Sequence, residues 1–334
     1  AKTISACISE IKSRNFKAEE IASISIDGTS GTIVPLDSEH KPLCEAFMYN
    51  DMRARDEAIK VHEACGDLEI KMGLRFNASF SLPRILWIKN NMPALYEKTD
   101  VFAHQADYIV GMLSGEYNVS DYSNALKTGY DLIDGCWPQC ITAGLGIDAG
   151  KLPKIVAPGT PVGRVTRNAA SALGLSEQTM VVAGSTDGYA SVLAAGAVDV
   201  GNWVSIIGTT MVLKGVTKSL VIDPSGSSYS HKLPSGKWML GGAANIGGRC
   251  LNTFFDKKEF PEYETYAEKL TPTGILSYPL VGTGERFPFV DPKAEAFIDG
   301  DASDKKVLFA ALMEGVGFAE RLAFDRMQQI GCHV

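Results

Sequence analysis

Short apolar runs alternate with amphipathic stretches along the whole chain. Apolar or β-branched runs predict strands at residues 21–26, 33–36, 181–183, 203–207, 211–216 and 238–240. Apolar positions at helical spacing predict helices at residues 52–65, 82–91, 106–113, 168–173, 189–195 and 307–329, with Gly66 and Gly115 as helix ends. Strands mixed with crossover helices predict an α/β fold that binds ligands at the carboxyl ends of its strands.

Four polar, glycine-rich turns follow predicted strands, at residues 27–32, 184–188, 208–210 and 241–248. Glycine lets the backbone approach a ligand closely, and successive turn N–H groups form an anion-binding concavity. Four such turns at strand ends favour a phosphate ligand. Neither the G-x-x-x-x-G-K-[ST] loop of P-loop NTPases nor the G-x-G-x-x-G dinucleotide pattern occurs in the sequence.

Asp187 comes directly after a predicted buried strand and before a helix of small residues. A carboxylate at this position can point into a ligand crevice and accept a hydroxyl proton during phosphoryl transfer. It can equally cap the helix that follows, and position alone does not separate the two roles. Aromatic rings beside hydrogen-bonding groups, which suit a sugar, occur at Tyr49-Asn50 and around Tyr122.

Charge and composition exclude several classes of binding partner and indicate where the protein is located. The chain of 334 residues carries a formal net charge of −7, which argues against nucleic acid or a membrane surface. The sequence shows no apolar run long enough to span a membrane and no secretory signal pattern at its start. Seven scattered cysteines predict reduced thiols and a cytoplasmic protein, and the five histidines have no metal-ligand spacing.

Together these segments resemble the FGGY carbohydrate kinase family, from residue 21 to the end of the chain. The most specific similarity is Ala183-Gly184-Ser185-Thr186-Asp187-Gly188 followed by glycines 196, 201 and 208. Residues 120–125 look like the family segment S/T-D-x-x-N-A, and residues 106–108 like its D-[WY]-[LI] helix start. Residues 27–32, 227–231 and 284–288 look most like the D-ribulose kinase and xylulokinase-like branch.

The resemblance implies two ribonuclease H-like domains of the actin, Hsp70 and sugar-kinase superfamily, with a cleft between them. We expect an N-terminal sugar-binding domain at residues 1–178 and a C-terminal nucleotide-binding domain at residues 179–334. It also implies ATP and Mg²⁺ as cofactors and a terminal hydroxyl of a ketopentose, such as D-ribulose or D-xylulose, as phosphoryl acceptor. No residue is assigned as a metal ligand.

The resemblance also implies roles for single residues. Asp187 matches the catalytic base and also touches the sugar. The expected sugar-side residues are Ser30, Gly31, Tyr49, Asn50 and Tyr122, and the expected nucleotide-side residues are Gly208, Thr209, Thr210, Gly247 and Gly248. Glycerol kinases carry an Arg-Glu pair where this chain has Ser30-Gly31, which argues against glycerol as the substrate.

Two family segments have no counterpart in the sequence. Family members begin with a D-x-G-T hairpin, whereas residues 1–17 of this sequence look like the helix that follows that hairpin. Family members also continue into a G-G-G-x-x-[RS] segment beyond the position that matches Val334. We therefore expect both domains to be incomplete in this chain. If the chain is the whole protein, we expect little or no kinase activity and poor stability, because sheet edges and core faces would be exposed.

Two functions stay open at this stage. The first is a pentulose kinase. The second is a non-catalytic or truncated sugar-kinase relative that acts as a sugar-binding or regulatory protein. An Hsp70-like or actin-like ATPase is disfavoured by the sugar-side segments around Ser30 and Tyr122. The expected partner is a small sugar, with no nucleic acid and no membrane, and a homodimer is left open.

Overall fold

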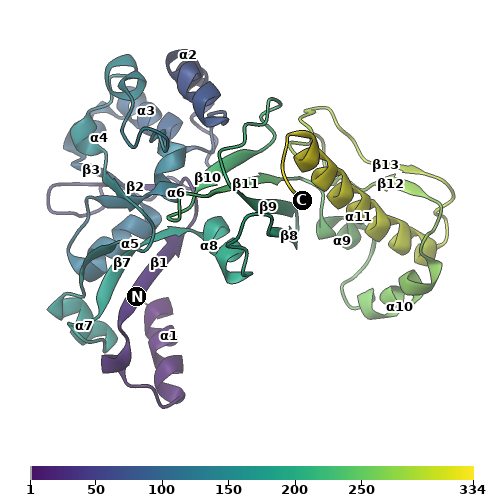
Figure 1. The fold of residues 1–334 in the computed structure, drawn as a ribbon, viewed down its shortest axis with the longest axis horizontal. Helices are drawn as coiled ribbons and strands as arrows, with labels where there is room; N and C mark the ends of the chain where they lie inside the picture. The colour runs from purple at the N-terminus through teal and green to yellow at the C-terminus, as the bar shows by residue number, and fades with distance from the viewer. Residues whose placement is uncertain (1) are drawn as a thin grey trace. The chain divides into compact units, whose positions relative to one another are not determined.

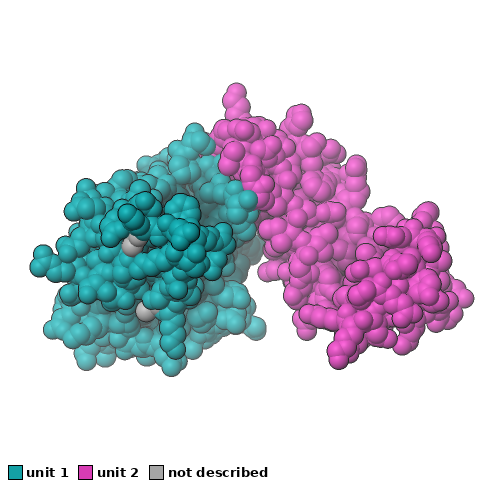
Figure 2. Space-filling view, turned by 90° about the horizontal axis from the view of Figure 1, so that it is seen from below, with its two compact units in different colours: residues 1–194, 231–236 teal, residues 195–230, 237–334 magenta. Residues whose placement is uncertain are grey.

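The chain divides into two units, which Figure 2 shows in different colours. A computed structural model of the protein describes residues 2–334. Unit 1 comprises residues 1–194 and 231–236, and unit 2 comprises residues 195–230 and 237–334. The sequence predicted a boundary near residue 178, but the compact units divide after Ala194, because helix α8 (Asp187–Ala194) packs against strands of unit 1. The limits of the functional domains stay a prediction.

Unit 1 contains most of the helices and seven short strands (Figure 1). Its strands are β1 (Ser23–Gly28), β2 (Ile33–Leu36), β3 (Val101–His104), β4 (Val119–Asp121), β5 (Lys154–Val156), β6 (Pro161–Arg164) and β7 (Met180–Thr186). Its helices are α1 (Lys2–Ser13), α2 (Arg55–Met72), α3 (Ser81–Asn91), α4 (Pro93–Lys98), α5 (Gln105–Ser114), α6 (Tyr122–Ala125), α7 (Arg167–Leu173) and α8. Shorter turns of helix are η1 (Ala18–Glu20), η2 (Leu126–Thr128), the π-helix η3 (Cys140–Gly144) and η4 (Ala149–Lys151).

The strands of unit 1 form three small sheets. The largest has the order β1-β7-β6, with β1 parallel and β6 antiparallel to β7. Strands β2 and β3 pair antiparallel, and β4 and β5 pair parallel. Helix α5 packs against β1 and β7, and Ile8, Val110, Leu113, Ala170 and Val181 form a buried apolar cluster from α1, α5, α7 and β7. This core supports the ends of β1 and β7, where the predicted site residues begin.

Unit 2 is built on an antiparallel sheet and a long helix (Figure 1). Its strands are β8 (Trp203–Ile207), β9 (Met211–Thr217), β11 (Trp238–Ala243), β12 (Leu276–Tyr278) and β13 (Phe297–Asp299). Strand β10 (Tyr229–Lys232) begins in unit 2, and its last two residues belong to unit 1. The sheet order is β10-β11-β9-β8, and β12 pairs with β13. Its helices are η5 (Gly248–Cys250), α9 (Leu251–Phe254), α10 (Phe260–Leu270) and α11 (Lys305–Gln329). Phe309 of α11 is buried against the rings of Phe255, Phe260 and Tyr263.

Most predicted elements are present, with shifted ends. Residues 33–36 and 203–207 are strands as predicted, and Gly115 ends α5 in a left-handed conformation with φ 87°. The first strand lies two residues later than predicted, at Ser23–Gly28. The helix expected at residues 1–17 ends at Ser13, because Asn15 takes a left-handed φ of 65°; Ala1 lies outside the described residues.

The helix predicted to end before Gly66 is interrupted at Cys65 by a kink but does not end there. Helix α2 leaves helical geometry only at Cys65 and continues to Met72, where Gly73 ends it with φ 61°. Val61, Leu68 and Met72 are all buried, so the apolar face continues at helical spacing across Gly66. Burial of this face outweighs the preference of a single glycine for a non-helical backbone.

The pairing of β1 with β7 requires a glycine at position 184. A Cβ atom added there would lie 1.6 Å from the carbonyl oxygen of Ile26, a backbone atom that cannot move aside alone. The register pairs Asp27 with Ser185 and Gly28 with Thr186. Any side chain at position 184 would therefore push β1 and β7 apart close to their carboxyl ends, where Ser30–Gly31 and Asp187 follow.

Replacement of Gly184 by alanine tests this close approach. We expect Gly184→Ala to lower the free energy of unfolding by about 3 kcal/mol, the upper range for an overpacked core. The control is Gly66→Ala, because a Cβ atom there meets nothing within 4 Å. Urea unfolding followed by circular dichroism measures both variants, and equal stability of the two would show that β1 and β7 are not so closely packed.

Candidate functional site

The carboxyl ends of β1 and β7 bring two predicted site segments to one edge of the sheet. The parallel register pairs Gly28 with Thr186, the last residues of the two strands. Ser30 and Gly31 follow β1, and Asp187 follows β7. These segments are far apart in the sequence, and the strand pairing places them at the edge where α/β sheets bind ligands.

Asp187 is the first residue of α8, and its side chain is exposed. One carboxylate oxygen, Oδ1, accepts a hydrogen bond from the backbone N–H of Gly188 at 2.6 Å. For the second oxygen, Oδ2, residues 2–334 provide no hydrogen-bond donor. One oxygen of Asp187 therefore accepts a hydrogen bond from the first turn of α8, and the other oxygen is open to solvent or to a ligand.

A buried carboxylate holds the backbone next to Asp187. Asp121 caps α6 and accepts hydrogen bonds from the backbone N–H and the hydroxyl of Ser123, at 2.8 and 2.6 Å, and from the amide side chain of Asn124 at 2.6 Å. The Ser123 hydroxyl in turn accepts a hydrogen bond from the Thr186 N–H at 2.9 Å. Residues 121–124, part of the segment that resembles S/T-D-x-x-N-A, thus fix the peptide between Ser185 and Thr186, one residue before Asp187.

Burial raises the pKa of Asp121, and the neighbouring Asp107 adds to this effect. Asp107 lies in the first turn of α5 and is buried. Its carboxylate accepts hydrogen bonds from the backbone N–H of His104 at 2.9 Å and from its ring at 2.7 Å, while the other ring nitrogen pairs with Thr128. Asp107 is therefore a capping residue inside a buried polar layer behind the sheet edge.

A single buried arginine joins the two predicted sugar-side loops. The guanidinium of Arg84 donates hydrogen bonds to the carbonyl oxygens of Gly31 at 2.5 Å, Tyr49 at 2.6 Å and Asp51 at 3.2 Å. The side chain is fully buried, and this burial lowers the pKa of Arg84 to about 10. Gly31 has φ 90°, and a Cβ atom there would lie 2.7 Å from the Ser79 carbonyl oxygen, so only glycine fits this bend.

The remaining predicted sugar-side side chains differ in exposure. Tyr49 and Asn50 are exposed, and Tyr122 is half-buried with the Nζ atom of Lys232 at 5.9 Å from its ring centroid. The hydroxyl of Ser30 is buried, and none of the described residues offers it a hydrogen-bond partner. A buried hydroxyl without a partner is costly, and a ligand hydroxyl next to it would relieve that cost.

The predicted nucleotide-side residues of unit 2 are brought together by backbone hydrogen bonds. The turn at Gly208–Thr210 joins β8 to β9, and the N–H of Gly248 donates to the Gly208 carbonyl oxygen at 2.8 Å. A Cβ atom on Gly247 would lie 2.6 Å from Cα of Thr210, so glycine is required for this contact. Within residues 2–334, the N–H groups of Thr209 and Thr210 have no acceptor. Free N–H groups on a turn are suited to an anion.

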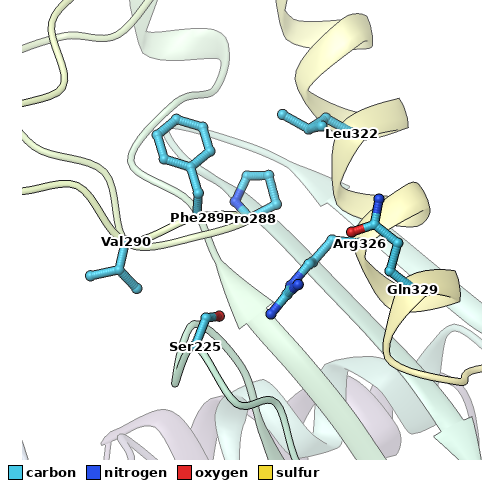
Figure 3. Close-up of a pocket in the computed structure, with 7 residues that line it drawn as sticks. All are labelled: Ser225, Pro288, Phe289, Val290, Leu322, Arg326 and Gln329. Atoms are coloured by element: carbon cyan, nitrogen blue, oxygen red, sulfur yellow. The ribbon is translucent and has the colours of Figure 1, made fainter.

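Unit 2 also has a cavity of about 400 Å³ against the end of α11 (Figure 3). Its lining consists of Ser225, Pro288, Phe289, Val290, Leu322, Arg326 and Gln329. Arg326 forms an ion pair with the buried Asp223 at 2.5 Å. None of the five predicted nucleotide-side residues lines this cavity, so the cavity and the turn at Gly208–Thr210 share no residue.

Sequence reasoning missed Arg84 and the role of Ser123. A charged residue inside the apolar run Leu82-Pro83-Arg84-Ile85-Leu86 is the signal that could have identified Arg84, because a buried arginine needs several acceptors. No such signal distinguishes Ser123, whose contact with Thr186 depends on the fold.

Two kinds of feature are absent from the described part of the chain. No group of three or more His, Cys, Asp or Glu side chains among residues 2–334 is arranged to hold a metal ion. No helix within the same residues combines the length and the apolar character needed to cross a membrane.

Comparisons with known proteins agree with the motifs. The chain is 28% identical over 345 residues to a xylulose kinase of Bacillus subtilis, covering 99% of this chain and 68% of that protein. It is 27% identical over 319 residues to a gluconokinase of the same organism, covering 89% of this chain and 62% of the relative. The crystal structure of a ligand-bound xylulose kinase from Lactobacillus acidophilus has a TM-score of 0.84 at 24% identity, covering 98% of this chain and 69% of that one.

The similarity in structure shows the sugar-kinase fold, and the chain spans about two thirds of the length of these relatives. Residues 1–194, more than half of the chain, match the N-terminal domain of the FGGY family of carbohydrate kinases. This match confirms the family that the motifs predicted, and xylulose kinases are among the relatives, as the predicted branch requires. The chain therefore belongs to the FGGY family of carbohydrate kinases.

Proposed function

We propose that the protein transfers the γ-phosphoryl group of ATP to a hydroxyl group of a small sugar, most specifically a ketopentose such as D-xylulose or D-ribulose. The observation that carries the proposal is Asp187, an exposed carboxylate with one free oxygen at the end of β7, next to a peptide held by Ser123. Family membership and the xylulose kinases among the relatives support the substrate class.

In the proposed reaction Asp187 acts as the general base. The free carboxylate oxygen accepts the proton of the sugar hydroxyl as that oxygen attacks phosphorus, and the bond from phosphorus to the leaving ADP oxygen breaks. Ser123 and Thr186 help to keep the carboxylate in position, because the hydrogen bond between them fixes the peptide between Ser185 and Thr186, one residue before Asp187. Bound ATP supplies the phosphoryl group, and Mg²⁺ neutralises the charge that develops on it.

The sugar-side residues are proposed to orient the acceptor hydroxyl toward Asp187. The buried Ser30 hydroxyl lacks a partner and can hydrogen-bond a sugar hydroxyl, and the exposed Tyr49 and Asn50 offer an aromatic face and an amide. Tyr122 is proposed as a second aromatic wall. D-xylulose and D-ribulose differ in the configuration of one hydroxyl, so the placement of such short polar groups decides between them.

On the nucleotide side, the turn at Gly208–Thr210 fits a phosphate. The free N–H groups of Thr209 and Thr210 can donate to phosphate oxygens, and Gly247 and Gly248 hold the turn from behind. Mg²⁺ commonly binds through substrate phosphates and water with few protein ligands, so we propose that it arrives with ATP. Seven free cysteines suit a reducing compartment, and we propose the cytoplasm as the location.

Replacement of Asp187 tests the catalytic base. We expect Asp187→Asn to lower kcat by about 10²–10⁴-fold, the usual contribution of a general base, while the Kd for D-xylulose by calorimetry changes little. The control is Asp100→Asn, because Asp100 is also exposed and lies outside the proposed site. Coupled ADP release with the full-length protein measures turnover. Unchanged turnover in Asp187→Asn would refute the base, and sugar binding without turnover in the wild-type protein would favour a non-catalytic relative.

Replacement of Arg84 tests the support of the sugar-side loops. We expect Arg84→Met to raise KM for the sugar and to lower the free energy of unfolding by about 3 kcal/mol, because buried carbonyl oxygens lose their donors. Arg84→Lys keeps the charge but cannot reach all three carbonyls, so its effect should be intermediate. The exposed Arg167→Met is the control. A KM for sugar that is unchanged in Arg84→Met would show that the loops do not depend on this residue.

Replacement of Gly247 tests the nucleotide-side turn. The added Cβ in Gly247→Ala would push Thr210 away, so we expect KM for ATP to rise about tenfold while the Kd for sugar stays constant. Gly317→Ala on α11 is the matched control, because a Cβ atom there meets nothing within 4 Å. Equal KM values for ATP in both variants would remove this turn from the proposed nucleotide site.

A further inference from the structure

Two cysteine side chains meet in unit 1, and neither belongs to the residues assigned above. The side chains of Cys65 and Cys140 face each other where α2 packs against η3. Cys65 lies in the middle of α2, and Cys140 is the first residue of the π-helix η3. The backbones are also close, because a Cβ atom added to Gly144 of η3 would lie 3.8 Å from Cβ of Ala64, the neighbour of Cys65 in α2.

The backbone is irregular on both sides of this thiol pair. Cys65 has φ −121° and ψ 24°, the only residue of α2 with non-helical angles, and η3 is a π-helix. Such irregularities inside helices are frequent at functional sites. The contact between α2 and η3 also ties together segments that are 75 positions apart, which is the difference between 140 and 65.

The two thiols differ in access and in acidity. Cys65 is 1% exposed, whereas Cys140 is half-buried and can be reached from solvent. The hydrogen bond with Cys65 lowers the pKa of Cys140, and the backbone N–H groups of Cys140 and Ile141 act in the same direction against burial. The same hydrogen bond raises the pKa of Cys65. One reactive thiol beside one protected thiol is the arrangement of an attacking and a resolving cysteine.

We propose that Cys65 and Cys140 form a redox modification site, which a small-molecule disulfide such as glutathione disulfide converts into a reversible intramolecular disulfide. The Cys140 thiolate attacks one sulfur of the reagent, the reagent S–S bond breaks, and one thiolate leaves. Cys65 then loses its proton and attacks the Cys140 sulfur, which releases the second thiolate. Two protein thiols are oxidised to one disulfide, and one reagent disulfide is reduced to two thiols.

The bond would close a long loop that contains α3, β3, α5 and α6. A disulfide limits the conformations of the unfolded chain, so the oxidised protein should be more stable. Helix α2 begins soon after Asp51, whose carbonyl oxygen Arg84 holds, so the bond would also fix the segment behind a proposed sugar-side loop.

The test uses the full-length protein equilibrated with reduced and oxidised glutathione, then alkylated and digested for mass spectrometry. We expect a Cys65–Cys140 cross-linked peptide with the loss of two hydrogen atoms, and a rise in Tm of about 5 °C that dithiothreitol reverses. Cys136→Ser is the matched control, because Cys136 is exposed in the same loop and should not be needed.

Single variants separate the roles of the two thiols. Cys65→Ser should stop at a mixed disulfide on Cys140, and Cys140→Ser should leave Cys65 reduced, with no rise in Tm in either variant. If a variant fails to fold, the peptide map of the wild-type protein decides. Cross-links between other cysteines, mixed disulfides alone, or no change in the wild-type protein would overturn the proposal. Kinase activity is not part of the readout, so this result is independent of the proposed function.

Discussion

The parallel pairing of β1 with β7 is the constraint on which the candidate site depends. Gly184 permits it, since the carbonyl oxygen of Ile26 occupies the place where a side chain would begin. The resulting register ends the two strands side by side at Gly28 and Thr186. Without this register, Asp187 and the loop at Ser30–Gly31 would not share a sheet edge, and the carboxylate and the proposed sugar-side loop could not act on one molecule.

Buried polar groups then turn this edge into a defined surface. Asp121 is a buried carboxylate that accepts hydrogen bonds from Ser123 and Asn124. The Ser123 hydroxyl in turn holds the peptide between Ser185 and Thr186, one residue before Asp187. Arg84 does the same for the loops at Gly31 and Tyr49 through three backbone carbonyls. Buried polar networks are stabilising only when their members are satisfied, so each network is sensitive to the loss of one partner.

Much of the local secondary structure could be predicted from the sequence, but the long-range contacts that hold the site segments could not. Strand 33–36 and the end of α5 at Gly115 follow from apolar pattern and glycine chemistry, which are local. At Gly66 the same reasoning predicted an end where α2 has only a kink at Cys65, because buried residues on both sides continue the helix. The contacts of Arg84 and Ser123 join segments far apart in the chain, and no local pattern encodes such contacts. The roles of the site residues stay predictions.

The most direct measurement is a crystal structure of the full-length protein with D-xylulose and a non-hydrolysable ATP analogue. The account predicts one sugar hydroxyl oxygen at about 3 Å from the free carboxylate oxygen of Asp187, with the sugar against the loop at Ser30–Gly31. A sugar bound in order at another place, with Asp187 facing only solvent, would contradict the central claim that the ends of β1 and β7 form the acceptor site.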